Sequence, residues 1–134
     1  MADNVKILIV EDEPDVLDYL TAIFEDEEYE VLSATNGKEA FELAQTFKPS
    51  LISLDITMPD EAGTRTYINL KKDPDLKDIP VIVVTATVDS ESALKNLFDG
   101  LSLPEGFVNK PVDPRRLLEI VRTILSGKGD AGRE

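Results

Sequence analysis

Carboxylates follow two of the aliphatic runs in this chain, and they are the side chains best placed to do chemistry. The run "ILIV" at 7–10 is followed by Glu11 and Asp12, and the run "LISL" at 51–54 is followed by Asp55. An acid directly after a buried strand needs either a backbone group to cap or a positive charge to meet. The strand cannot simply continue past Asp55, because a methionine and a proline follow within four residues.

A hydroxyl and an ammonium group follow the same pattern. The run "VIVVT" ends at Thr85, and the run "GFVN" is followed by Lys110. Taken singly, the acids at 11–13, which include Glu13, suit a helix N-terminus, the threonine suits a strand and the lysine suits a surface, whereas Asp55 is the hardest to explain in this way. Ligands of open parallel sheets bind outside the carboxyl ends of the strands, near the point where the strand order reverses. The coincidence of these residue types at one sheet edge therefore favours a functional site.

Any chemistry at this edge must use carboxylates, hydroxyls and lysines, because the chain has no histidine and no cysteine. Like charges a few Å apart cannot all stay ionised near neutral pH unless a cation lies among them. Oxygen ligands without nitrogen or sulfur select a hard ion such as Mg²⁺. Mg²⁺ bound to protein carboxylates usually also binds a phosphate group. A carboxylate beside such an ion can attack phosphorus, as in enzymes that form aspartyl-phosphates.

The elements that position these residues alternate along the chain. Short aliphatic runs predict strands at 5–10, 30–33, 50–54, 81–85 and 106–109. Helices are predicted within 16–24, 38–47, 61–72, 90–99 and 117–125. Such alternation predicts an α/β fold, a doubly wound (βα)5 sandwich whose five-stranded parallel sheet has the flavodoxin-like order 2-1-3-4-5.

Helix starts agree with the periodicity. Pro14 and Pro114 suit first-turn positions, and Asp113 is a predicted cap for the helix that Pro114 opens. Asn36, with Glu39 three residues later, resembles a capping box.

Composition limits the class of protein. The chain has 134 residues, 42% of them apolar, which suits one domain, predicted over 1–125 with a frayed polar tail at 126–134. Its 27 acidic and 14 basic residues give a net charge of −13, which argues against direct nucleic-acid binding. No signal peptide or membrane-spanning stretch is recognisable, so we expect no membrane insertion and a cytoplasmic location.

Four motifs in order resemble the receiver domain of two-component response regulators, the chemotaxis-regulator-like family. They are "ILIVEDEP", "LISLDITMPDEAG", "DPDLKDIPVIVVTA" and "VNKPVDP". The resemblance covers residues 4 to about 125. Any one motif is weak alone, but four in register are highly specific.

The resemblance implies a role for each acid. Asp55 matches the phosphoacceptor, which takes a phosphoryl group from a histidine kinase or a histidine phosphotransfer protein. Glu11 and Asp12 match the acidic pair of the Mg²⁺ site, with Asp55 itself and the backbone carbonyl of Thr57 as further ligands.

The resemblance also implies roles for the other candidates. Thr85 matches the switch hydroxyl that moves to meet the phosphate. Lys110 matches the lysine that pairs with a phosphate oxygen, and Pro111 follows it through what is often a cis peptide. Phe107 lies where the family places an aromatic rotamer switch.

Three departures from the family pattern stand out. Glu61 and Ala62 replace the usual apolar residue and aspartate before the motif glycine, and 99–106 is longer than the usual turn. Thr57 and Thr87 stand two residues beyond the acceptor and the switch threonine, where they would flank the water that attacks the phosphate. The long turn is interpreted either as a recognition element for a partner or as ordinary variation in loop length.

The hypothesis is a phosphorylation-activated signalling switch, not an enzyme acting on a free substrate, which signals through the face of the fourth helix, fifth strand and fifth helix. One alternative is a metal-dependent phosphohydrolase or nucleotidyl-transfer domain that uses Glu11, Asp12 and Asp55. Such folds generally need a second aspartate where this chain has Thr57. Another alternative is a receiver-like binding module that is never phosphorylated. The sequence specifies neither the cognate kinase nor a downstream target or fused output domain.

Overall fold

Five parallel strands form one sheet in the order β2-β1-β3-β4-β5, as predicted. The computed structural model of the chain describes residues 5–56, 62–86 and 103–127. The strands are β1 (Lys6–Val10), β2 (Glu30–Ala34), β3 (Leu51–Asp55), β4 (Val81–Thr85) and β5 (Gly106–Asn109). Because all five run the same way, their carboxyl ends lie at one edge of the sheet.

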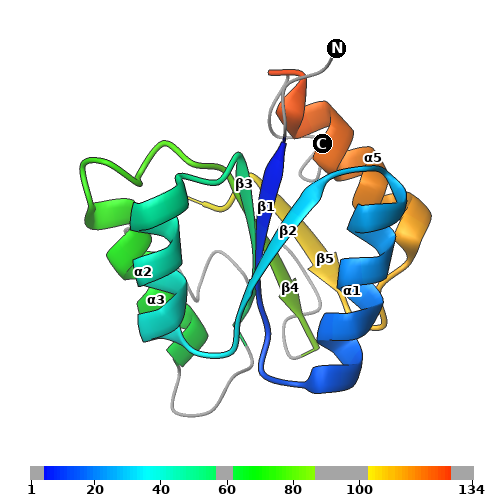
Figure 1. Cartoon of the computed structure of the whole chain (residues 1–134), viewed down its shortest axis with the longest axis horizontal. Coiled ribbons are helices and arrows are strands. Elements are labelled where there is room, and N and C mark those ends of the chain that lie inside the picture. The colour runs from blue at the N-terminus through cyan, green and yellow to red at the C-terminus, as the bar shows by residue number, and fades with distance from the viewer. Residues whose placement is uncertain (1–4, 57–61, 87–102, 128–134) are drawn as a thin grey trace.

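Helices cover both faces of the sheet (Figure 1). Those within the described ranges are α1 (Pro14–Asp26), α2 (Gly37–Phe47), α3 (Ala62–Lys72) and α5 (Pro114–Leu125). α1 and α5 lie on one face, and α2 and α3 lie on the other. The helix predicted at 90–99 and most of the predicted tail lie outside the described residues. None of these helices is long and apolar enough to span a membrane.

The core is split by the sheet, and β1 shows how. Ile7 and Ile9 pack with the residues of α1 and α5, whereas Leu8 and Val10 pack with those of α2 and α3. All four side chains are buried, and each contributes about 1.5–3 kcal/mol relative to an exposed position. The central strands are therefore held on both faces, which makes their carboxyl ends a fixed platform.

Strand boundaries differ from the prediction by one residue in β1, β2 and β3, and the difference at the end of β3 bears on the acids. β3 was predicted to end at Leu54, but it extends to Asp55, which pairs with Val84 of β4. The aliphatic pattern stops at Leu54, whereas backbone pairing with β4 continues for one more residue. Asp55 is thus part of the sheet itself.

The predicted capping box at α2 is present in a shifted form. The Asn36 side chain accepts a hydrogen bond from the Glu39 N–H at 2.8 Å. The Glu39 carboxylate in turn accepts a hydrogen bond from the N–H of Thr35, also at 2.8 Å, and not from that of Asn36. Both interactions fix the start of the helix, but the second acts one residue earlier than in a regular capping box.

Part of the unusual turn at 99–106 is described, and it is tied to the start of β4. The Glu105 carboxylate accepts a hydrogen bond from the Val81 N–H at 2.8 Å and lies 3.4 Å from the ammonium of Lys71. That ammonium also donates to the Ile79 carbonyl at 3.2 Å. Glu105 therefore anchors the entry to β5.

The start of α5 yields a prediction about stability. The Asp113 carboxylate accepts a hydrogen bond from the Arg115 N–H at 3.1 Å, as the capping prediction requires. Asp113→Ala removes this acceptor and should lower the free energy of unfolding by about 1 kcal/mol. Urea unfolding curves measure this change. Asp113→Asn keeps a side-chain oxygen and is the matched control. An equal loss in both variants would contradict the capping role.

Candidate functional site

Two backbone ladders bring the predicted acids together. β1 and β3 are neighbours, with Val10 opposite Leu54, so the residues that follow them meet at the same edge. The Glu11 N–H continues the pairing of β1 with β2 by donating to the Ala34 carbonyl at 3.0 Å. Glu11 is thereby held beside Asp55 by main-chain bonds on both strands.

Three carboxylates form what we call the acid cluster: Glu11, Asp12 and Asp55. One oxygen from each lies within 4.8 Å of the others. Glu11 is 1% exposed and Asp55 is 2% exposed, whereas Asp12 faces solvent. Buried carboxylates are costly unless a positive charge or hydrogen bonds compensate them. The cluster therefore needs cations close by.

Lys110 supplies one positive charge. Its ammonium nitrogen lies 3.2 Å from Glu11 Oε1, 3.3 Å from Asp55 Oδ2 and 3.1 Å from Glu13 Oε1. The Lys110 N–H donates to the Thr85 carbonyl at 2.9 Å, which extends the pairing of β4 with β5. The lysine is thus held by the sheet on one side and reaches across to β1 and β3, and the Lys110–Pro111 peptide is cis.

These charges shift two pKa values. Burial raises the pKa of Glu11 to about 7, and the charge of Asp55 acts in the same direction, while Lys110 opposes both. Burial alone would lower the pKa of Lys110, but its attraction to Asp55, Glu13 and Glu11 outweighs this, and the net shift is upward. Lys110 is therefore a cation throughout the physiological range, and the site remains short of positive charge.

One atom of the cluster shows where further positive charge fits. Glu11 Oε1 is buried and accepts no hydrogen bond from any residue that the structure describes. It lies within ion-pair distance of Lys110, but without hydrogen-bond geometry. A hard divalent cation, ligated only by oxygen, suits such an atom beside two other carboxylates. The acid cluster thus fits Mg²⁺.

Of the remaining predicted residues, Thr85 and Phe107 lie within the described part of the chain. Thr85 is fully buried at the end of β4, opposite Asn109. Phe107 lies in β5 opposite Val83 and packs, partly buried, against the core on the α2 and α3 face. Thr57, the predicted carbonyl ligand, lies outside the described residues.

Sequence reasoning missed Glu13. It was interpreted only as an acid favoured by a helix N-terminus, and it does stand at the N-cap of α1. Its side chain caps no backbone group there and contacts Lys110 instead, although it is 63% exposed. The acidic run at 11–13 was a signal, but a partner 97 residues away could not be read from it.

Residues 7–122 match the model of the response regulator receiver domain. The chain belongs to this family. Receiver domains are regulatory modules of two-component phosphorelay systems, and the acid cluster lies where the family resemblance predicted an acidic site.

Individual relatives agree with this assignment. The chain is 36% identical to protein PilH of Pseudomonas aeruginosa over 122 residues, which cover 91% of the chain and 98% of PilH. It is 33% identical to response regulator Rre1 of Synechocystis, of which it spans only 58%. A receiver domain of a histidine kinase from Syntrophus aciditrophicus superposes with a TM-score of 0.79 at 34% identity, covering 97% of this chain and 94% of that one.

The raised pKa of Glu11 predicts a pH dependence of stability in the metal-free protein. Between the ordinary value of 4.5 and about 7, the folded chain holds a proton that the unfolded chain releases. The free energy of unfolding should therefore fall as the pH rises through this window, with the loss complete above about pH 7. Urea unfolding at a series of pH values, in the presence of a chelator, measures the slope of the free energy of unfolding against pH.

Two variants test whether the titration of Glu11 causes this slope. Glu11→Gln should flatten it, because the titrating group is gone. Glu13→Gln removes an exposed carboxylate that contacts the same lysine and should keep most of it. A wild-type slope in Glu11→Gln would show that another group is responsible.

Proposed function

We propose that the chain is a phosphorylation-dependent switch in which Asp55 accepts a phosphoryl group from a histidine kinase or a histidine phosphotransfer protein. The observation that carries the proposal is the placement of Asp55. It is a buried carboxylate at the carboxyl end of β3, 3.3 Å from the Lys110 ammonium and beside two other acids. The family match over residues 7–122 supports the same role.

The proposed step is an in-line displacement at phosphorus. A carboxylate oxygen of Asp55 bonds to phosphorus while the bond from phosphorus to an imidazole nitrogen of the donor breaks. The electron pair stays on that nitrogen, and a donor ring protonated on its other nitrogen leaves as neutral imidazole. The product on this chain is an acyl phosphate.

The acid cluster is the proposed Mg²⁺ site, with the Thr57 carbonyl as a further ligand. When bound, the metal neutralises negative charge on the transferring phosphoryl group. Lys110 is poised for the same purpose, since its ammonium already lies 3.3 Å from Asp55 Oδ2 and can pair with an oxygen added there. The positive charges of the metal and of Lys110 would both be in position before the phosphoryl donor arrives, so the site need not reorganise during the transfer.

The signal is proposed to leave the site through Thr85 and Phe107. Thr85 ends the strand next to β3, where its hydroxyl can donate to a phosphoryl oxygen. Phe107 lies on the neighbouring strand and is only partly buried, so it can repack when Thr85 moves. The proposed output surface comprises residues 90–99, β5 and α5, and a phosphoryl group shifts the balance between its inactive and active forms.

Several finer points belong to the same proposal. The receiver domain extends over residues 1–125, acts in the cytoplasm and promotes only its own phosphorylation and dephosphorylation. A partner protein or an attached output domain reads its state. Thr57 in place of a second aspartate favours this acceptor chemistry over a hydrolase that turns over a free substrate.

NMR spectra of the backbone amides test the proposal. They are recorded with Mg²⁺ and beryllofluoride, which mimics a phosphoryl group on a carboxylate. The wild type should show shifts at Thr85 and Phe107 that require both additives. Asp55→Asn should show none, because the attachment point is lost. Asp18→Asn, which changes an exposed acid of α1 outside the acid cluster, should respond as the wild type does.

Two results would contradict the proposal. One is an absence of shifts at both reporters in the wild type, or equal shifts in Asp55→Asn. The other is continuous release of phosphate from an external phosphoester with many turnovers per chain, which would favour the hydrolase interpretation.

A further inference from the structure

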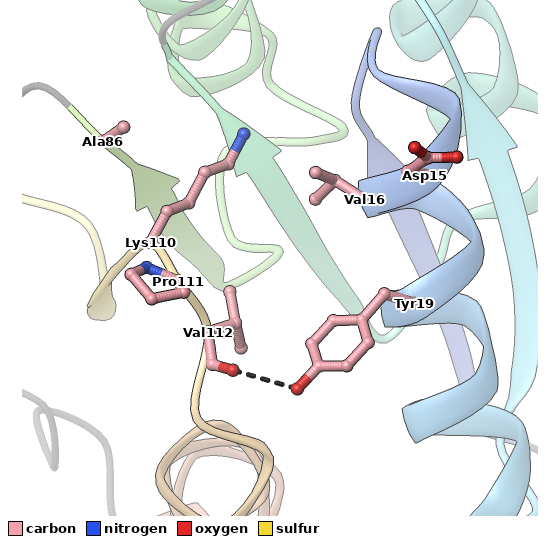
Figure 2. A pocket seen from close by; sticks show the side chains of 7 residues that line it. All are labelled: Asp15, Val16, Tyr19, Ala86, Lys110, Pro111 and Val112. Carbon is pink, nitrogen blue, oxygen red and sulfur yellow. Dashed lines mark hydrogen bonds between the residues drawn. The ribbon is translucent and has the colours of Figure 1, made fainter.

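A hydrogen bond joins α1 to the segment that carries Lys110. The hydroxyl of Tyr19 donates to the main-chain carbonyl of Val112 at 3.2 Å, across 93 positions of sequence (Figure 2). Val112 stands two residues after Lys110 and directly before the cap of α5. We call residues 110–112 the lysine turn. The bond therefore connects the helix that follows the acidic run at 11–13 with the turn that neutralises it.

The two ends of the lysine turn are held by different contacts. At the first end, the Lys110 N–H donates to the Thr85 carbonyl at 2.9 Å. At the second end, the Val112 side chain is buried in the core shared by α1 and α5, and its carbonyl accepts the Tyr19 bond. Figure 2 shows the Lys110 side chain pointing away from Val112, so a shift of the second end would tilt the lysine relative to Asp55.

A groove separates α1 from the lysine turn on the solvent side. Its volume is about 560 Å³, and Val16 and Pro111 line opposite sides of it, with Tyr19 beside them (Figure 2). α1 and the lysine turn are therefore not closely packed against each other along this groove. Tyr19 is 46% exposed, yet its hydroxyl spans to the turn.

Resting on the proposed function, we propose that Tyr19 is a positioning residue for phosphorylation. Through the Val112 carbonyl, its hydroxyl fixes the lysine turn so that the Lys110 ammonium stays over Asp55. The hydroxyl of Tyr19 bonds to Val112, so in this proposal it acts through Lys110. The remaining distances support this, since Lys110 must satisfy three carboxylates at 3.1–3.3 Å at once, an arrangement sensitive to small movements of its backbone.

The test measures the rate at which Asp55 is phosphorylated by phosphoramidate and Mg²⁺. Tyr19→Phe keeps the ring and removes only the hydroxyl, so the rate should fall roughly two- to tenfold, the range that one net hydrogen bond provides. A small donor is essential. A tyrosine that merely contacts a donor protein would leave this rate unchanged, and that result would overturn the proposal.

Tyr29→Phe is the matched control. Tyr29 follows the far end of α1, beyond Asp26, and its ring packs near Phe24. Removing its hydroxyl should leave the phosphorylation rate at the wild-type value. An equal fall in Tyr29→Phe and Tyr19→Phe would mean that the rate reports general loosening of the fold, which would also overturn the proposal.

A double-mutant cycle separates positioning from a purely structural role. Tyr19→Phe should slow the reaction in the wild-type background but have no further effect in Lys110→Met, because the group that it positions is gone. The same fall in both backgrounds would show that Tyr19 does not act through Lys110. A wild type that phosphoramidate cannot phosphorylate at all would count against the proposed function, a distinct outcome.

A second measurement decides the matter if Lys110→Met reacts too slowly to time. Spectra of the lysine ammonium groups, recorded on unphosphorylated protein, should show the Lys110 signal shifted or broadened in Tyr19→Phe and unchanged in Tyr29→Phe. An unchanged Lys110 signal in Tyr19→Phe would contradict the proposal.

Discussion

The contact between Lys110 and the two buried carboxylates is the interaction on which the site depends. Glu11 and Asp55 are brought side by side by the pairing of β1 with β3, so their repulsion follows directly from the strand order. One lysine from the end of β5 offsets it in part. The raised pKa of Glu11, and its Oε1 atom that accepts no hydrogen bond from the described residues, both indicate that the compensation is incomplete. A site with this deficit is suited to a divalent cation.

The fold keeps the deficit in place. The central strands are packed on both faces, and each acid follows from a strand end that main-chain bonds fix. The acids cannot relax apart without breaking the sheet. Lys110 is held in a different way, because the lysine turn is tied to β4 at one end and to α1 and the core at the other. The position of the site's cation thus depends on contacts outside the strand ends that carry the acids.

Local patterns were enough to predict the sheet order and to place Glu11, Asp55 and Lys110 at one edge of the sheet. Asp55, Glu11 and Lys110 were found because each follows an aliphatic run, and parallel strands place such positions at one edge. The end of β3 was placed one residue early, since backbone pairing continues past the aliphatic pattern. The roles of Glu13 and Tyr19 were not predicted. Both depend on partners more than 90 residues away, and neither residue type is unusual for its helix.

The central claim is that Asp55 is the group that carries the phosphoryl group. The most direct measurement treats the protein with phosphoramidate and Mg²⁺, reduces the product with borohydride and sequences its peptides by mass spectrometry. An acyl phosphate is reduced to an alcohol, so the account predicts homoserine at position 55. Modification of any other residue, or no uptake of phosphate in Mg²⁺, would contradict it.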